Sequence, residues 1–139
     1  MTAETPRNFL GIPPEFDDPA RSRFAVLPGP YEKTTTYAKG TARGPEALLE
    51  ASRQVEFYDE ELERETYREG IHTAPPFVWE GPHEEMAPAL ATRCRELHGE
   101  GRVVAAIGGE HSITLGPILA LRERYPRLSV LHIDAHGDL

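Results

Sequence analysis

The chain has 139 residues, 39% of them hydrophobic and 27% charged, as expected of one globular domain or part of one. Its formal net charge of −8 argues against nucleic acid and anionic membranes as partners. The single cysteine, Cys94, excludes a disulfide within the chain and favours a reducing compartment. Neither an apolar stretch of membrane length nor a signal peptide is recognisable, so we expect a cytoplasmic protein.

The first part of the chain predicts an arm followed by a buried strand. Residues 1–22 are too rich in proline and charge for regular structure, and we interpret them as an arm laid over a surface. Phe24–Leu27 is a short apolar run that stops at Pro28, which is typical of a buried strand. We therefore expect residues 23–139 to form a portion of a single α/β domain.

Residues 28–45 form a long loop, of the kind that often lines a site when it follows a strand. A helix should begin near Pro45, with Leu48, Ala51 and Val55 as its inner stripe. The glycine-rich turn before this helix lacks both the G-x-G-x-x-G and the lysine-ended phosphate-binding patterns. We therefore interpret it as a structural turn, and a dinucleotide-binding domain is disfavoured.

The remaining elements alternate between strands and helices. An acidic solvated segment, 56–70, precedes a brief strand at 71–73 and an amphipathic helix over 82–98, which includes Cys94 among its core positions. Val103–Ile107 is apolar on both faces, a helix follows with Leu115 and Ile118 among its apolar positions, and Leu128–Ile133 is the last strand. This order predicts an α/β fold with a parallel sheet and helices on both faces.

The last strand leads into residues that bind metal ions. Asp134, His136 and Asp138 alternate, so in an extended segment they share a face about 6–7 Å apart. Two divalent ions about 3.5–4 Å apart could sit across such a row. Carboxylates with imidazole and no thiolate suit manganese better than structural zinc. The alternative is an aspartate-rich turn in which Asp134 or Asp138 only caps the next element.

A second strand end supplies His111, which follows Val103–Ile107 and the turn at Gly108 and Gly109. Ligands gather beyond the carboxyl ends of parallel strands, so we expect His111 to complete the cluster. Ser112 is adjacent to His111 in sequence and is interpreted as a turn or cap residue rather than a nucleophile. His132 is favoured as a core or outer-shell histidine.

These two motifs resemble the first two signatures of the ureohydrolases, the arginase and agmatinase family. Gly-Gly-Glu-His-Ser at 108–112 and Asp-Ala-His-Gly-Asp at 134–138 carry the resemblance. Residues 30–48 are similar to the family's N-terminal loop and first helix, in the agmatinase style. The resemblance implies a three-layer α/β/α fold with a mainly parallel sheet, a trimer or hexamer, and two Mn²⁺ ions per subunit.

The resemblance also implies roles for individual residues. His111 and Asp138 would hold one ion, His136 the other, and Asp134 would bridge both and hold the attacking hydroxide. The substrate would be a small cationic guanidino compound, with agmatine hydrolysed to putrescine and urea. The family's third signature, Ser-x-Asp-x-Asp, is not found in the 139 residues. We therefore expect them to be the N-terminal half of a longer enzyme and to be inactive alone.

Two alternatives remain open. The substrate could be another amidine of the same family, namely arginine, guanidinobutyrate or formimidoylglutamate. The chain could instead be a non-catalytic module that uses the same fold for oligomerisation. Metal content and product release by the intact protein discriminate between these interpretations.

Overall fold

A three-stranded parallel sheet is the centre of the computed structural model, which describes residues 7–99 and 101–137. Strand β1 (Phe24–Gly29) lies between β4 (Ile71–Thr73) and β5 (Val103–Gly108), and both neighbours run parallel to it. All three strands were expected, β1 and β5 from their apolar runs and β4 as a brief strand, but β1 continues through Pro28, where it was expected to stop. β1 and β5 pair along their full length, from Phe24 opposite Val103 to Gly29 opposite Gly108.

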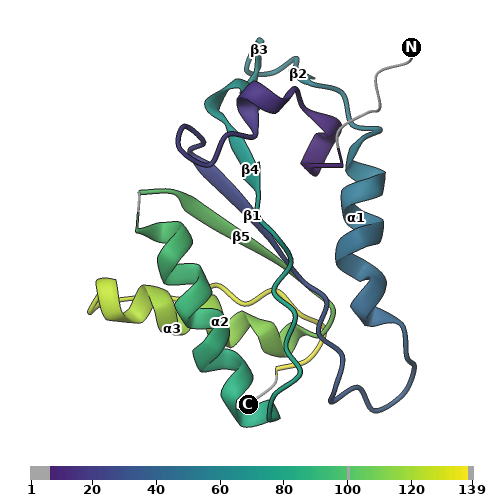
Figure 1. Cartoon of the computed structure of the whole chain (residues 1–139), viewed down its shortest axis with the longest axis vertical. Coiled ribbons are helices and arrows are strands. Elements are labelled where there is room, and N and C mark those ends of the chain that lie inside the picture. Colours follow the sequence, from purple (N-terminus) through teal and green to yellow (C-terminus); the bar gives the residue numbers. More distant parts are fainter. Residues whose placement is uncertain (1–6, 100, 138–139) are drawn as a thin grey trace.

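Helices cover the sheet as the fold class requires. Figure 1 shows α1 (Gly44–Ser52) on one side, with α2 (His83–His98) and α3 (Leu115–Arg124) on the other. A small antiparallel hairpin, β2 (Tyr58–Asp59) with β3 (Arg64–Glu65), occupies the acidic segment. The 3₁₀ turns are η1 (Phe9–Gly11), η2 (Pro14–Phe16), η3 (Thr41–Arg43), η4 (Thr66–Glu69) and η5 (His111–Thr114). The parallel α/β fold with flanking helices is therefore confirmed.

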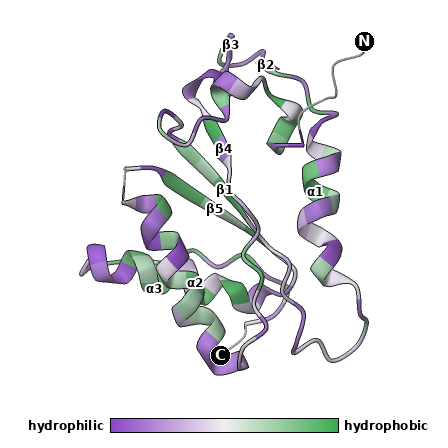
Figure 2. Ribbon diagram, in the orientation of Figure 1, coloured by the Kyte–Doolittle hydropathy of each residue, from purple (hydrophilic) through white to green (hydrophobic). Residues whose placement is uncertain are grey.

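The hydrophobic core lies between the sheet and the pair α2 and α3. Figure 2 shows hydrophobic strands against the helices on that side. Leu27 and Leu90 are fully buried, and a side chain at Gly116 could not fit because its Cβ would lie 2.5 Å from Leu90 Cγ. α3 therefore packs closely on α2 at this glycine. The core cluster comprises Ala25, Leu27, Tyr31, Ala74, Met86, Leu90, Ala91, Cys94, Leu97, Ile113 and Ala120.

The predicted inner stripe of α1 is wrong. Leu48 and Val55 are 43% and 57% exposed, and Ala51 is also exposed. The buried residues of α1 are Pro45 and Ser52, seven positions apart on one helix face. A serine occupies this buried position instead of an apolar residue, and its hydroxyl accepts a hydrogen bond from the Leu10 N–H at 2.8 Å. This hydrogen bond fastens the N-terminal arm to the helix.

The predicted last strand, Leu128–Ile133, is also wrong. No strand is assigned there, and Leu131 and Ile133 are 86% and 89% exposed. A strand needs a neighbouring strand with which to form backbone hydrogen bonds, and an apolar strand also needs packed side chains covering each of its faces. In the described residues β5 pairs with β1 alone, and its residue Val103 is 55% exposed. The apolar pattern was present, but the packing that would make it a strand was not.

The described part of the arm packs against the domain. Ile12 is fully buried, and the Phe9 N–H donates to Thr73 Oγ1 at 2.9 Å. Arg102 is buried and donates to the carbonyls of Leu97 and Pro19, which joins the arm to the end of α2. Within the described ranges no helix is long and apolar enough to cross a membrane. The cytoplasmic location stays a prediction.

The core position of Leu90 provides a test of this packing. We expect Leu90→Ala to lower the free energy of unfolding by about 2–5 kcal/mol, because a fully buried side chain leaves a cavity. Chemical denaturation of the purified protein measures the change. The control Leu62→Ala, at a side chain 55% exposed, should change it by less than about 1 kcal/mol. Equal effects of the two substitutions would contradict the assigned core.

Cys94 is buried, as the sequence predicted. Burial raises the pKa of its thiol from 9.0 to about 11, because the thiolate would lose its hydration. The contribution of the neutral thiol to the free energy of unfolding is therefore complete below pH 9. It is lost as the pH rises from 9 towards 11, because the thiol of the unfolded chain ionises first. We expect the difference in unfolding free energy between wild type and Cys94→Ala to shrink over that range. A difference that stays constant with pH would contradict this assignment.

Candidate functional site

The site is built where the carboxyl ends of β1 and β5 meet. Gly29 and Gly108 are paired in register, so the loops that follow both strands start at the same edge of the sheet. The Gly109 N–H donates to Gly29 O at 3.2 Å, and the Glu110 N–H donates to Tyr31 O at 3.1 Å. These backbone hydrogen bonds continue the ladder beyond the strands. They fix the segment that leads to His111 against the loop that follows β1.

Gly109 allows this close approach. A Cβ at this position would lie 2.3 Å from Tyr31 O, 3.0 Å from Thr41 O and 3.1 Å from Ala42 N. All three are backbone atoms, which cannot rotate away as a side chain can. Both ends of the loop 31–42 therefore lie against one glycine. The sequence analysis assigned this glycine only a sharp turn, whereas its main role is close packing.

Glu110 is a residue that the sequence analysis missed. It is 7% exposed, and its carboxylate accepts the Thr34 N–H at 2.6 Å and the hydroxyls of Thr34 and Ser112. Burial alone would raise the pKa of Glu110, but these hydrogen bonds together lower it below its ordinary value. The one feature of the sequence that points to Glu110 is its position between the Gly-Gly pair and His111. Ser112 serves this turn, as predicted.

Glu32 closes the same loop from the other side. Its carboxylate accepts the N–H groups of Gly40 at 2.9 Å and Ala42 at 3.0 Å. The hydrogen bond from Ala42, followed by that from Gly40, lowers the pKa of Glu32. Gly40 has a φ of 122°, which an L side chain rarely adopts. Two carboxylates therefore hold the loop, one at each end.

Imidazole rings surround the carboxylate of Asp134. His111 Nδ1 lies 3.6 Å from Asp134 Oδ2, His132 Nε2 lies 3.8 Å from the same oxygen, and His136 Nδ1 lies 3.8 Å from Oδ1. The His136 N–H also donates to Asp134 Oδ1 at 2.9 Å, and this bond is the main cause that lowers the pKa of Asp134. The structure thus brings three of the four predicted ligands, His111, Asp134 and His136, to one place.

The other predictions have mixed outcomes. Asp138 lies outside the described residues. His132 was expected in the core or near a ligand; it is 49% exposed, so the core position is wrong, but it does contact Asp134. His111 and His136 have side chains that are 64% and 84% exposed, so this cluster lies at the surface of the described chain.

The imidazole nitrogens and carboxylate oxygens around Asp134 are atom types that bind divalent ions. Two atoms bound to one ion at about 2.1 Å lie at most about 4.2 Å apart, and the three N···O distances to Asp134 fall below that limit. Imidazole and carboxylate without thiolate are compatible with manganese. Across residues 7–99 and 101–137, however, no three such side chains are arranged to hold an ion. Ligation by His111, Asp134, His136 and Asp138 therefore stays a prediction.

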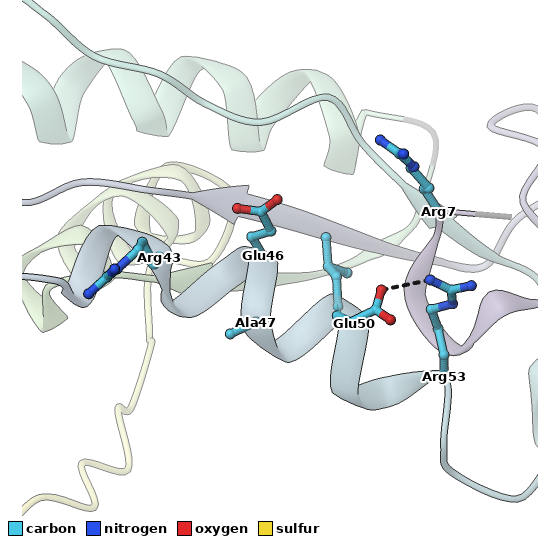
Figure 3. Close-up of a pocket in the computed structure, with 7 residues that line it drawn as sticks. Arg7, Arg43, Glu46, Ala47, Glu50 and Arg53 are labelled. Atoms are coloured by element: carbon cyan, nitrogen blue, oxygen red, sulfur yellow. Dashed lines mark hydrogen bonds and ion pairs between the residues drawn. The ribbon is translucent and has the colours of Figure 1, made fainter. Parts of the chain in front are cut away.

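A hollow of about 400 Å³ adjoins His111 and is also lined by Glu110, Ile113 and Pro117. A larger hollow of about 680 Å³ lies along α1, and Figure 3 shows its charged lining. Arg43 and Glu46 belong to its lining, and Arg53 pairs with Glu50 at 2.6 Å. Of the predicted ligands, His111 lines the smaller hollow and none lines the larger one.

A model of the arginase family matches residues 22–139, a span that includes both strand ends and the cluster around Asp134. The chain belongs to the arginase family. This membership was expected from the two motifs.

Several arginase-family proteins are similar to the chain. An N(1)-aminopropylagmatine ureohydrolase of Synechocystis is 40% identical and matches 97% of the chain, and one of Thermus thermophilus is 40% identical over 85%. An agmatinase of Bacillus anthracis is 28% identical over 94% of the chain. The chain spans less than half of these relatives, 48%, 41% and 44% of their lengths respectively.

Two solved structures share the fold. The structure of a putative agmatinase from Clostridium difficile superposes with a TM-score of 0.77 at 22% identity, covering 86% of this chain and 44% of that one. Agmatine ureohydrolase of Thermoplasma volcanium gives a TM-score of 0.68 at 21% identity, covering 74% and 35%. At these identities the superpositions establish the architecture.

The close approach at Gly109 can be tested directly. We expect Gly109→Ala to displace the loop 31–42 and to lower the free energy of unfolding by about 1–3 kcal/mol, since its Cβ would overlap Tyr31 O. Chemical denaturation measures the loss. Gly137→Ala is the matched control, because no described atom lies within 4 Å of a Cβ there. A Gly109→Ala protein as stable as this control would contradict the packing.

Proposed function

We propose that the intact protein carrying this chain is a metal-dependent ureohydrolase that converts agmatine and water to putrescine and urea. One observation carries the proposal: in a chain of the arginase family, His111 from the end of β5 lies 3.6 Å from Asp134, on a segment 23 positions later in the sequence. Both residues belong to the motifs that define the resemblance. The family supports hydrolysis of a guanidinium group in general, and agmatine is the finer assignment.

The chemistry explains why carboxylate and imidazole are needed. A guanidinium carbon is a poor electrophile because its positive charge is shared by three nitrogens. Hydrolysis forms a C–O bond from water, breaks the C–N bond to the alkyl amine, and transfers a proton to that amine. A bound divalent ion supplies Lewis acidity that lets water act as a nucleophile near neutral pH.

The residues of this chain would hold and orient the reacting groups. His111, Asp134, His136 and Asp138 would bind two Mn²⁺ ions, with Asp134 shared between them. An aspartate is an anion at neutral pH, and the hydrogen bond from the His136 N–H and the nearby imidazoles lower the pKa of Asp134 further. The net charge of −8 is compatible with a cationic substrate.

A second candidate substrate is N(1)-aminopropylagmatine. Two relatives with that printed activity are 40% identical to the chain, compared with 28% for the Bacillus anthracis agmatinase. The reacting guanidinium is the same in both compounds. The discrimination would depend on the far end of the substrate, where the longer compound carries an added aminopropyl group.

Product release by the intact protein tests both candidates. The protein supplied with Mn²⁺ should release urea from agmatine or its aminopropyl derivative at a kcat/KM at least about tenfold above that for arginine or guanidinobutyrate, a difference of about 1.4 kcal/mol in transition-state binding. Formimidoylglutamate should not be hydrolysed. An intact protein that binds no metal and hydrolyses none of these compounds would favour the non-catalytic oligomeric module.

Asp134→Asn provides a test at the level of one residue. Because the neutral amide would be a weaker ligand, we expect kcat/KM to fall by more than the ~10–100-fold that loss of an outer-shell partner costs. Bound Mn²⁺, measured by elemental analysis, should fall as well. Asp59→Asn, in the β2–β3 hairpin, is the control and should retain both. Full activity in Asp134→Asn would rule out the proposed bridging role.

A further inference from the structure

Glu110 is a buried acid whose charge is stabilised by hydrogen bonds. Of the residues described, it is the one acidic side chain in the buried class, at 7% exposed. The ion pairs found in those residues do not include it. A buried carboxylate is costly unless hydrogen bonds replace its hydration. The groups that donate to it therefore indicate what it holds in place.

Those donors come from two different segments. Thr34 donates its N–H, at 2.6 Å, and its hydroxyl, and it belongs to the loop that follows β1. Ser112 donates its hydroxyl at 3.2 Å and belongs to η5, the turn that His111 begins. One carboxylate thus bridges the loop and the turn. Hydrogen bonds to an ionised acceptor are about twice as strong as neutral ones, which suits this bridging role.

The loop is also held at both ends by contacts that do not involve the Glu110 side chain. Glu32 accepts the N–H groups of Gly40 and Ala42, and Gly109 packs against Tyr31 O and Thr41 O. These contacts keep the loop closed and near the site. Thr34 is therefore the point at which the loop is joined by side chains to the turn that carries His111.

We propose that Glu110 is a positioning residue that fastens the loop 31–42 to the η5 turn and thereby sets the orientation of the His111 ring toward Asp134. The ring immediately follows Glu110 in the chain and stands 3.6 Å from Asp134, so a shift of the turn would change that distance directly. The hollow of about 400 Å³ beside the turn is lined by both Glu110 and His111. Glu110 acts through His111 and is assigned no contact with substrate.

The consequence for metal binding rests on the proposed function, whereas the orientation of the ring does not. An acid that served only stability would lower the unfolding free energy without changing the surroundings of His111. The test therefore needs a signal from the His111 ring itself, measured without metal. It also needs a second variant that loosens the same bridge from the loop side.

The experiment compares Glu110→Gln and Thr34→Val with wild type in the intact protein. Glu61→Gln, at an exposed acid near the β2–β3 hairpin, is the matched control. Three quantities are measured: amide hydrogen exchange at Thr34, the NMR signal of the His111 Cε1–H in metal-free protein, and the affinity for Mn²⁺. The His111 signal is assigned by its loss in His111→Asn.

We expect exchange at Thr34 to be about 10–100-fold faster in Glu110→Gln, as for loss of a charged hydrogen bond in a buried site. The His111 signal should shift in Glu110→Gln and in Thr34→Val, and stay unchanged in Glu61→Gln. Mn²⁺ affinity should fall by about 10–100-fold in Glu110→Gln, the usual cost of losing an outer-shell partner. If Glu110→Gln does not fold, Thr34→Val tests the same bridge.

An unchanged His111 signal in the folded variants overturns the proposal, even if exchange at Thr34 becomes faster. A shifted signal in the variants supports it, whether or not the wild type binds Mn²⁺. Failure of wild-type protein to bind Mn²⁺ or to release urea would instead count against the proposed function. The two hypotheses therefore fail on different measurements.

Discussion

The parallel pairing of β1 with β5 is the constraint on which the site depends. Because Gly29 and Gly108 are in register, the two following loops leave the sheet side by side, and backbone hydrogen bonds continue from Gly109 and Glu110 to the first loop. A shift of one residue would turn Gly109 away and place a side chain against Tyr31 O. His111 has a defined position because the backbone before it is held by these contacts.

The acids of this chain have different physical roles that its net charge does not reveal. Glu32 and Glu110 accept backbone N–H groups and hold a loop, so their charge is used for structure. The carboxylate of Asp134 lies instead within 4 Å of three imidazole nitrogens, from His111, His132 and His136. The environment of each carboxylate, rather than its residue type, separates these roles.

The side of the sheet where α2 and α3 pack contrasts with the C-terminal segment. Small residues such as Gly116 let α3 approach α2 closely, and Leu27 and Leu90 are fully enclosed. Leu131 and Ile133 have the same hydrophobic character and are almost entirely exposed. Burial requires a partner surface as well as an apolar side chain, and in the described residues Leu131 and Ile133 have no such surface.

The sequence by itself determined the parallel α/β class, the strands at 24–27, 71–73 and 103–107, the helix over 82–98, the buried Cys94 and the family, and the structure extends the first strand to Gly29 and the third to Gly108. These features depend on local hydrophobic patterns and on short motifs, which are visible in one dimension. It also predicted that His111 and Asp134 come together, because parallel strands end at a common edge.

Tertiary structure alone decided the rest. Ser52, and not the predicted Leu48, lies on the buried face of α1, where its hydroxyl accepts a hydrogen bond from the Leu10 N–H of the arm. Glu110 is buried because a threonine 76 positions earlier in the chain donates to it. The segment 128–133 is exposed and not a strand because neither a ladder partner nor a covering layer meets it in the described structure. Each outcome depends on contacts between distant segments, which local patterns do not contain.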